Sequence, residues 1–247
     1  MAPLIIAHRT CPKDAPENSI QGIQTAPRLG ADAVEVDLRL SLDQKPFILH
    51  DWSLHRTTGF CLPIEATPSA YVRKLRLRGS NEPVPTLQAA MDALDSSLML
   101  AVDVKTPWSI WHLAREVKKR GLEARTLAWC QSELDVRYMR RFAPEVETAY
   151  LRSDTDPAGK LAYLAKAVRL GANAISAEWR AIDPSFVNTA HELGLKVYSW
   201  HAERELTPAK LESGLDGLVT DYPVEARKAF EKLEQGTGNK ERDEPGS

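Results

Sequence analysis

The stretch AVEVDLRLSLDQKPFILHD, Ala33 to Asp51, places Glu35, Asp37 and His50 in one short and largely apolar segment. Residues two apart in a β-strand point to the same face of a sheet, so the two carboxylates share one face. Neighbouring carboxylates on a buried face repel each other and are costly to desolvate. A bound cation removes both problems, and Mg²⁺ and Ca²⁺ prefer oxygen ligands. The pattern therefore predicts a strand that carries metal ligands.

A hairpin is predicted directly after this strand. The polar run SLDQK, residues 41–45, separates it from a second apolar segment, PFILHD. Two such segments joined by a short polar turn are typical of a β-hairpin. With the turn near residues 42–44, His50 returns opposite residues 35–37 and brings an imidazole beside the two carboxylates. The alternative interpretation is that Glu35 and Asp37 form structural ion pairs and that His50 is a core histidine.

The rest of the chain alternates predicted strands with predicted helices. Besides the return arm of the hairpin at Pro46 to Leu49, the predicted strands are Leu4 to Ala7, Ala33 to Leu40, Met99 to Val104, Thr126 to Cys130, Glu147 to Leu151, Ala174 to Ala177, Lys196 to Trp200 and Gly217 to Thr220. Each of these eight is followed by a helix, which favours a TIM-type (β/α)8 barrel. A doubly wound open sheet is the alternative, but no glycine-rich nucleotide-binding motif follows the first strand.

The predicted barrel is one catalytic domain of residues 1–233, with a hairpin and a short loop-rich insertion after the second strand. The insertion covers residues 52–84. The last helix is expected to end near Leu233. Residues 234–247 are polar, and we expect them to form a disordered tail.

Composition limits the possible partners and the cellular location. The 32 Lys and Arg against 34 Asp and Glu give a formal net charge of −2, which favours neither nucleic acid nor a polybasic membrane contact. Three widely spaced cysteines without a C-x-x-C pair suit a reducing compartment. The chain shows no signal-peptide pattern and no apolar run of about 18 residues. We expect a cytoplasmic protein without an integral membrane segment, and the oligomeric state stays open.

Polar and ionisable side chains recur at the predicted carboxyl ends of the strands, where such a barrel has its active site. They are His8, Arg9, Glu35, Asp37, Asp103, Lys105, Trp200, His201 and Asp221. A chance distribution would scatter these residue types over both ends of the strands. Their convergence predicts a catalytic site.

The ordered motifs HR, PEN, E-x-D, HD with RTT, PTL, D-x-K and TDYP, between His8 and Pro223, resemble the glycerophosphodiester phosphodiesterase family. This resemblance implies a TIM-type barrel that hydrolyses glycerophosphodiesters to glycerol 3-phosphate and an alcohol, using a divalent metal, Mg²⁺ or Ca²⁺. The implied substrate is a small molecule. Each motif is unspecific alone, and the specificity lies in their order and spacing.

The resemblance also implies roles for individual residues. It makes His8 and His50 the catalytic pair, makes Glu35, Asp37 and Asp103 the metal ligands, and assigns substrate contacts to Arg9, Lys105 and Trp200. The chain departs from the family pattern at four places: Thr10 stands for a Gly, Ser19 for a Thr, Asp103 for the usual Glu, and His201 follows Trp200 in place of Thr. These departures bear on substrate preference more than on the reaction.

The residue types fit this chemistry independently of the family. A divalent cation neutralises phosphoryl oxygens, an arginine grips two oxygens, and a lysine acts as a point charge. One histidine takes a proton from the attacking hydroxyl or water, and the other donates one to the leaving alkoxide. The sequence leaves open which histidine is the acid, which alcohol leaves, and whether a cyclic intermediate forms.

Two other functions stay open. One is a phospholipase D-type hydrolysis of lysophospholipids, which needs an apolar rim from Leu54, Phe60, Leu62 and Ile64 of the insertion. The other is a non-catalytic barrel that only binds phosphate esters. A binding module has no need of two acid/base histidines, so His8 and His50 argue against it.

Overall fold

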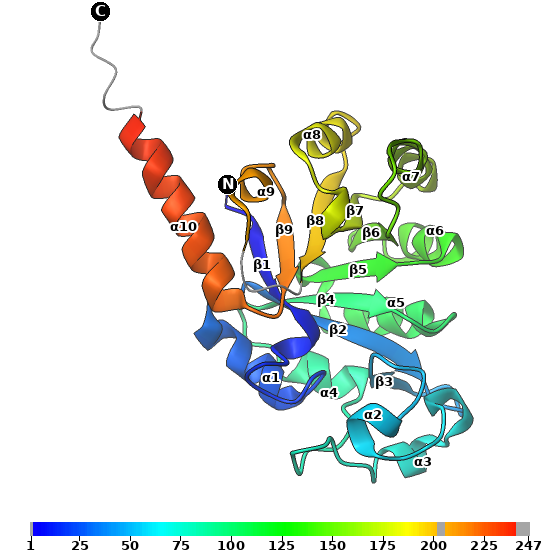
Figure 1. Ribbon diagram of the computed structural model, residues 1–247. Coiled ribbons are helices and arrows are strands. Elements are labelled where there is room, and N and C mark those ends of the chain that lie inside the picture. The colour runs from blue at the N-terminus through cyan, green and yellow to red at the C-terminus, as the bar shows by residue number, and fades with distance from the viewer. Residues whose placement is uncertain (1, 202–205, 241–247) are drawn as a thin grey trace, which may run out of the picture.

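The computed structural model describes residues 2–201 and 206–240, which form a closed ring of parallel strands surrounded by helices (Figure 1). The ring contains β1 (Leu4–Ala7), β2 (Ala33–Leu40), β4 (Met99–Val104), β5 (Thr126–Cys130), β6 (Glu147–Arg152), β7 (Ala174–Glu178), β8 (Lys196–His201) and β9 (Gly217–Thr220). It closes because β1 pairs in parallel with both β2 and β9. The predicted (β/α)8 barrel is therefore confirmed.

Helices return the chain between successive strands, so all carboxyl ends of the ring strands lie at one end of the barrel. They are α1 (Ile20–Thr25), α4 (Leu87–Asp92), α5 (Ser109–Arg120), α6 (Glu133–Phe142), α7 (Pro157–Leu170), α8 (Pro184–Glu192), α9 (Pro208–Leu211) and α10 (Pro223–Lys240). The side chains of Ser132, Asp156 and Asp183 cap α6, α7 and α8 by accepting a backbone hydrogen bond in the first turn.

Alternation along the strands separates two cores. In β2, Val34, Val36 and Leu38 face the helices and are fully buried in the larger core. Ala33 faces the barrel interior, where it packs with residues such as Leu127 and Tyr198. Glu35 and Asp37 share that inward face but lie nearer the carboxyl end of the strand, so the alternation that builds the core also aims both carboxylates into the barrel.

The predicted hairpin is present, and its return arm lies outside the ring. The strand β3 (Pro46–Ile48) pairs antiparallel with β2, with Leu38 opposite Ile48. The insertion that follows carries the short helices α2 (His55–Thr58) and α3 (Ser69–Val72), which lie near β3 in Figure 1.

Most of the four apolar residues named for a possible rim of the insertion are buried. Leu54 and Ile64 are fully buried, because they pack with Phe47 and neighbouring residues in a small core beneath the insertion. Phe60 is half-buried against the same core, and only Leu62 is exposed. These four residues therefore do not form an apolar rim together, although Trp52, Leu62 and Tyr71 of the insertion are exposed.

The last helix, α10, continues to Lys240, past the end near Leu233 expected from the sequence. The expected end marked the last apolar residue, whereas Glu234 and Gln235 are good helix formers that extend the helix without adding core contacts. The remainder of the predicted tail, residues 241–247, lies outside the described residues.

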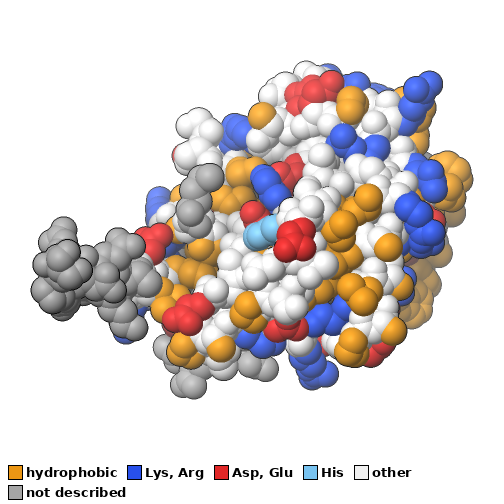
Figure 2. All heavy atoms as spheres, turned by 90° about the horizontal axis from the view of Figure 1, so that it is seen from above, with side chains coloured by type: hydrophobic (Ala, Val, Ile, Leu, Met, Phe, Trp, Pro, Cys, Tyr) orange, Lys and Arg blue, Asp and Glu red, His pale blue; other side chains and the backbone are white. Residues whose placement is uncertain are grey.

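The surface carries a mixture of side-chain types. On the face shown in Figure 2, basic, acidic and hydrophobic side chains are interspersed, in keeping with the net charge of −2. No helix among the described residues is both long and apolar enough to cross a bilayer.

Candidate active site

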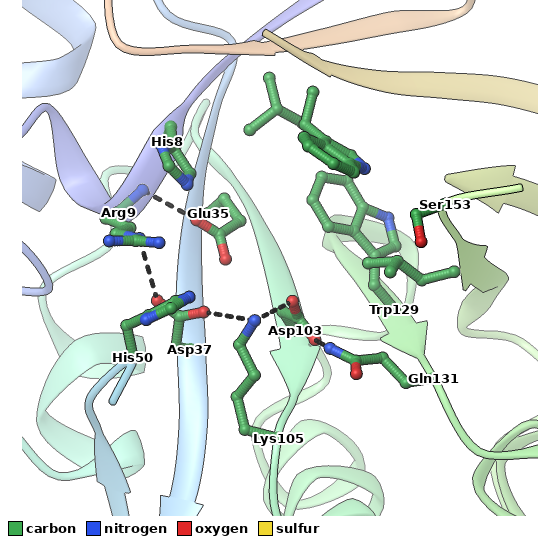
Figure 3. A pocket seen from close by; sticks show the side chains of 13 residues that line it. His8, Arg9, Glu35, Asp37, His50, Asp103, Lys105, Trp129, Gln131 and Ser153 are labelled. Atoms are coloured by element: carbon green, nitrogen blue, oxygen red, sulfur yellow. Dashed lines mark hydrogen bonds and ion pairs between the residues drawn. The ribbon is translucent and has the colours of Figure 1, made fainter. Parts of the chain in front are cut away.

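A pocket of about 430 Å³ lies at the carboxyl ends of the strands and is lined by all eight residues to which the family resemblance assigned a role (Figure 3). It is lined by His8, Arg9, Glu35, Asp37, His50, Asp103, Lys105, Trp129, Gln131, Leu151, Ser153, Trp200 and Val219. His8, Arg9, Glu35, Asp37 and His50 lie on one side in Figure 3, and Trp129 lies on the other. The ring thus brings together residues separated by up to two hundred positions and gives the pocket a charged wall and an aromatic wall.

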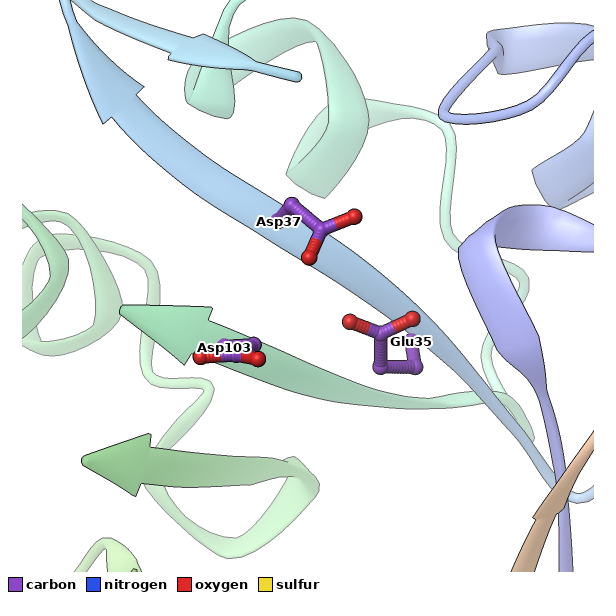
Figure 4. Close-up of side chains that lie close together, drawn as sticks. All are labelled: Glu35, Asp37 and Asp103. Atoms are coloured by element: carbon purple, nitrogen blue, oxygen red, sulfur yellow. The ribbon is translucent and has the colours of Figure 1, made fainter. Parts of the chain in front are cut away.

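Three carboxylates converge on the charged side. Strand register places Asp37 beside Asp103 on the neighbouring strand, while Glu35 lies one step deeper on the same inward face. One oxygen from each of the three side chains lies within 4.8 Å of the others (Figure 4). All three are buried, with exposed fractions of 3, 1 and 6% for Glu35, Asp37 and Asp103.

This proximity perturbs the ionisation of all three acids. Burial and the charge of Asp37 raise the pKa of Glu35 to about 8. Burial also raises the pKa of Asp103, although the Lys105 ammonium opposes it. The pKa of Asp37 is lowered, because Lys105, His50 and the amide of Asn18 together outweigh its burial. Asp37 is therefore the acid of the cluster whose ionised form its neighbours stabilise most.

Lys105 lies between two of the acids. Its Nζ is 2.6 Å from Oδ2 of Asp103 and 3.2 Å from Oδ1 of Asp37. Gln131 holds the other oxygen of Asp103, with its amide nitrogen 3.2 Å from Oδ1. Lys105 therefore pairs with both Asp103 and Asp37 inside the pocket.

Asn18 and the backbone of Arg9 fix the two acids of β2. Asn18 donates to Oδ2 of Asp37 at 2.8 Å and accepts the backbone N–H of the same residue at 3.1 Å. It has φ 53°, a left-handed conformation that asparagine tolerates. The N–H of Arg9 donates to Oε2 of Glu35 at 2.8 Å. These bonds orient the carboxylates before any ligand binds.

Each of the two histidines forms a hydrogen bond to a carboxylate through Nδ1. Nδ1 of His8 is 2.6 Å from Asp221, which directly follows β9, and Nδ1 of His50 is 2.8 Å from Asp51. Asp51 is held in turn by Arg56. With Nδ1 engaged in this way, Nε2 of each ring is left for the pocket.

Asp221 also influences the charge of His8. Burial disfavours the charged imidazole, but the hydrogen bond to Asp221 and the charge of Glu35 outweigh burial, so the pKa of His8 lies above its ordinary value.

The loop after β1, which begins with His8, has a strained backbone from Arg9 to Cys11. Arg9, Thr10 and Cys11 all have positive φ values of 43°, 62° and 65°, which cost roughly 1–3 kcal/mol each for residues other than glycine. Thr10, which stands where the family has Gly, compensates by accepting the N–H of Ser19 at 3.0 Å. Gly22 makes room for this loop, since a Cβ there would lie only 2.0 Å from the carbonyl oxygen of Thr10.

Sequence reasoning did not assign roles to Trp129 and Gln131 or to the pairing of Asp221 with His8. Asp221 was visible as a polar residue at a strand end, but its partner lies 213 positions away. Trp129 and Gln131 reach the pocket from β5 and the residues just after it, and a tryptophan in an apolar strand has no pattern that separates a pocket wall from a core residue. Only the order of the strands in the ring reveals the pairing of Asp221 with His8 and the place of Trp129 and Gln131 in the pocket.

The residues present fit a divalent cation. The donor set is three buried carboxylates within one ion's reach, and oxygen-only ligation is what Mg²⁺ and Ca²⁺ take. Burial and the charge of Asp37 both disfavour the ionised form of Glu35, and a bound cation would favour that form.

Asp221→Asn tests whether this carboxylate positions His8. We expect kcat/KM to fall at least about tenfold, because the amide no longer fixes the imidazole tautomer. The limb of the pH profile set by His8 should move to lower pH, since the carboxylate that favours the charged ring is gone. Rates measured from pH 5 to 9 provide the check, and an unchanged profile would contradict a positioning role.

Comparison with known proteins assigns the family. A sequence profile of the glycerophosphoryl diester phosphodiesterase family matches residues 8–225. A glycerophosphodiester phosphodiesterase of Caldanaerobacter subterraneus is 25% identical over 236 residues, covering 90% of this chain and 96% of the relative.

Solved structures share the fold. A glycerophosphodiester phosphodiesterase from Parabacteroides distasonis superimposes with a TM-score of 0.81 at 22% identity, covering 95% of this chain and 99% of its own. A phosphodiesterase of Oleispira antarctica, solved in complex with the product sn-glycerol-3-phosphate, has a TM-score of 0.80 at 24% identity, covering 93% and 97%. The chain belongs to the glycerophosphoryl diester phosphodiesterase family and is a phosphoric diester hydrolase.

Proposed function

We propose that this protein hydrolyses small glycerophosphodiesters to glycerol 3-phosphate and an alcohol, in a reaction that depends on a divalent metal held by Glu35, Asp37 and Asp103. The observation that carries the proposal is the convergence of these three buried carboxylates with two carboxylate-supported histidines in one pocket. The product bound in the Oleispira antarctica relative supports the same substrate class.

The cations of the pocket bind the diester phosphate. Arg9 and Lys105 face the same space as the acids, and the guanidinium Nε of Arg9 is 3.7 Å from Oδ2 of Asp37 without making a hydrogen bond. A planar guanidinium suits two phosphoryl oxygens, and an ammonium adds a point charge. A bound divalent cation supplies further neutralisation of charge that develops on the phosphoryl oxygens.

The two histidines move the protons. One Nε2 takes the proton of the attacking hydroxyl or water, and the other gives a proton to the departing alkoxide. The raised pKa of His8 favours its charged form near neutral pH, which suits the proton donor. Cys11 takes no part as a nucleophile, because burial raises its pKa to about 12 and keeps the thiol protonated.

The direct test is release of glycerol 3-phosphate from several headgroup diesters, with and without a chelator. We expect turnover that a chelator abolishes and that added Mg²⁺ or Ca²⁺ restores; the two ions tested separately identify the effective one. Full activity in excess chelator would contradict the metal, and no turnover of any diester in the presence of metal would contradict the function.

Metal affinity should depend on pH. Because burial and Asp37 raise the pKa of Glu35 to about 8, this acid is protonated at lower pH and must lose its proton to ligate an ion. One released proton makes the apparent affinity fall by about tenfold for each pH unit below 8. Calorimetric titration with Mg²⁺ or Ca²⁺ between pH 6 and 9 measures this slope, and a flat profile would contradict the release of a proton from Glu35 on metal binding.

A further inference from the structure

Two tryptophans that line the pocket have a buried indole N–H without a hydrogen-bond partner among the residues that the structure describes. Nε1 of Trp129 and Nε1 of Trp200 are both buried, and neither makes a hydrogen bond to any residue that the structure describes. The Trp129 side chain is only 2% exposed, and both residues line the catalytic pocket. Buried donors are normally paired, so two orphaned donors at one site indicate that something else accepts their hydrogen bonds.

The position of Trp129 follows from the barrel. It lies on β5 directly beside Asp103 in the strand register, with Ala149 as its neighbour on the other side. The small alanine leaves room for the indole inside the ring, and the ring of Tyr198 packs beneath it at a centroid distance of 5.9 Å. The indole is thus held by packing at the level of the carboxylate cluster, across the pocket from His8 and Arg9 (Figure 3).

The chemistry of this wall defines what it binds. Trp129, Leu151, Trp200 and Val219 carry no charge, so placing a phosphate there would bury an anion against apolar groups at high cost. The phosphate instead has the cations of the opposite wall. An indole N–H only donates, so its partner must be an acceptor, which an alkyl chain or a quaternary ammonium is not. The neutral acceptors that every glycerophosphodiester offers are its ester oxygens, which lie beside the phosphate, and its glycerol hydroxyls, which can lie apart from the phosphate on this wall.

Building on the function proposed above, we infer that Trp129, together with Trp200, binds the glycerol hydroxyls of the substrate through their indole N–H groups. Trp129 is then a specificity residue that selects a hydroxylated alcohol over its deoxy analogue. A site built to hydrogen-bond a hydroxyl rejects an analogue without it, because the buried donor is left unpaired.

The test compares substrates within each variant. The kcat/KM values for a glycerophosphodiester and for two deoxy analogues, each lacking one glycerol hydroxyl and carrying the same leaving alcohol, are measured for the wild type and for Trp129→Phe. We expect the wild type to prefer the parent over one analogue by roughly tenfold or more. The decisive analogue is one that the wild type still hydrolyses, because an analogue without the attacking hydroxyl would fail for a different reason. For that analogue Trp129→Phe, which keeps an aromatic ring but has no N–H, should reduce the ratio to near one.

Matched variants separate this role from packing. Trp200→Phe should lose discrimination at a hydroxyl as well, whereas Trp111→Phe, at an exposed position outside the pocket, should keep the full ratio. A general loss of rate with an unchanged ratio would assign Trp129 to packing and overturn the inference. A wild type without activity on any glycerophosphodiester would instead contradict the proposed function.

A second measurement uses only the wild-type protein, so it does not depend on whether a variant folds. Addition of sn-glycerol 3-phosphate to ¹⁵N-labelled wild-type protein should shift two of the six indole N–H signals, and inorganic phosphate alone should not. Equal shifts with both ligands would mean that these donors bind the phosphate, and no shift would mean that only water accepts from them. Either result would overturn the inference.

Discussion

Replacing either His8 or His50 by alanine should lower kcat by about 10²- to 10⁴-fold, the usual scale for removal of a general acid or base. Both rings line the pocket and rest on carboxylates through Nδ1, so each is oriented for proton transfer rather than for core packing. Substrate affinity should survive, because Arg9 and Lys105 still bind the phosphate. Steady-state kinetics on a glycerophosphodiester measure both quantities, and the wild-type profile of kcat/KM against pH should be bell-shaped.

His191→Ala is the matched control for these variants. Nε2 of His191 also pairs with an aspartate, at 2.8 Å from Oδ2 of Asp216. His191 lines a different pocket, however, which lies at the amino ends of β1 and β9 and is also lined by Leu4 and Asp216. Its removal should leave kcat unchanged. Near-normal rates for both His8→Ala and His50→Ala would show that the two rings are structural.

A nitrophenyl ester distinguishes the two histidine roles. Its leaving group needs little protonation, so it should restore the rate of whichever variant lacks the general acid and not that of the other. The double variant should fall by less than the product of the single effects, because groups that act as a unit are not additive. The raised pKa of His8 predicts that His8→Ala is the variant that is rescued.

Asp37→Asn should abolish most metal binding and lower kcat/KM by at least about 100-fold, a loss on the scale known for disturbed metal sites. Asp37 is 1% exposed and belongs to the carboxylate cluster, so the amide removes one negative charge from the ion's ligands. Folding should be nearly unaffected, since the side chains are almost isosteric and Asn18 can still hydrogen-bond the amide. Metal titration and thermal unfolding without metal measure the two effects separately.

Asp135→Asn provides the control for that change. Asp135 is a comparably buried aspartate, 7% exposed, on α6 and outside the pocket, so its loss should leave metal affinity as it was. If Asp37→Asn unfolds while Asp135→Asn does not, the acid has a structural ion-pairing role with Lys105, and the metal hypothesis fails at this position.

The sequence by itself determined the barrel and the charged wall of the pocket. Period-two alternation placed Glu35 and Asp37 on one face of a strand. The repeated βα units indicated that the carboxyl ends of the strands converge, so the sequence alone assigned His8, Asp103 and Lys105 to the same site. Such patterns are local: each follows from side-chain direction along one strand or from the order of elements.

Only the tertiary structure decided which groups act on one another. The pairing of His8 with Asp221 and the double contact of Lys105 with Asp37 and Asp103 depend on distances across the ring. The same is true of the Trp129 indole, which has no partner within residues 2–201 and 206–240. The burial of Leu54 and Ile64 also depends on the tertiary structure. Their apolar character is compatible with either an exposed rim or a core, and the packing of the insertion places both in a core. A sequence pattern fixes the direction of a side chain relative to its own strand, whereas its partner, burial and pKa are set by residues that the ring brings close from elsewhere in the chain.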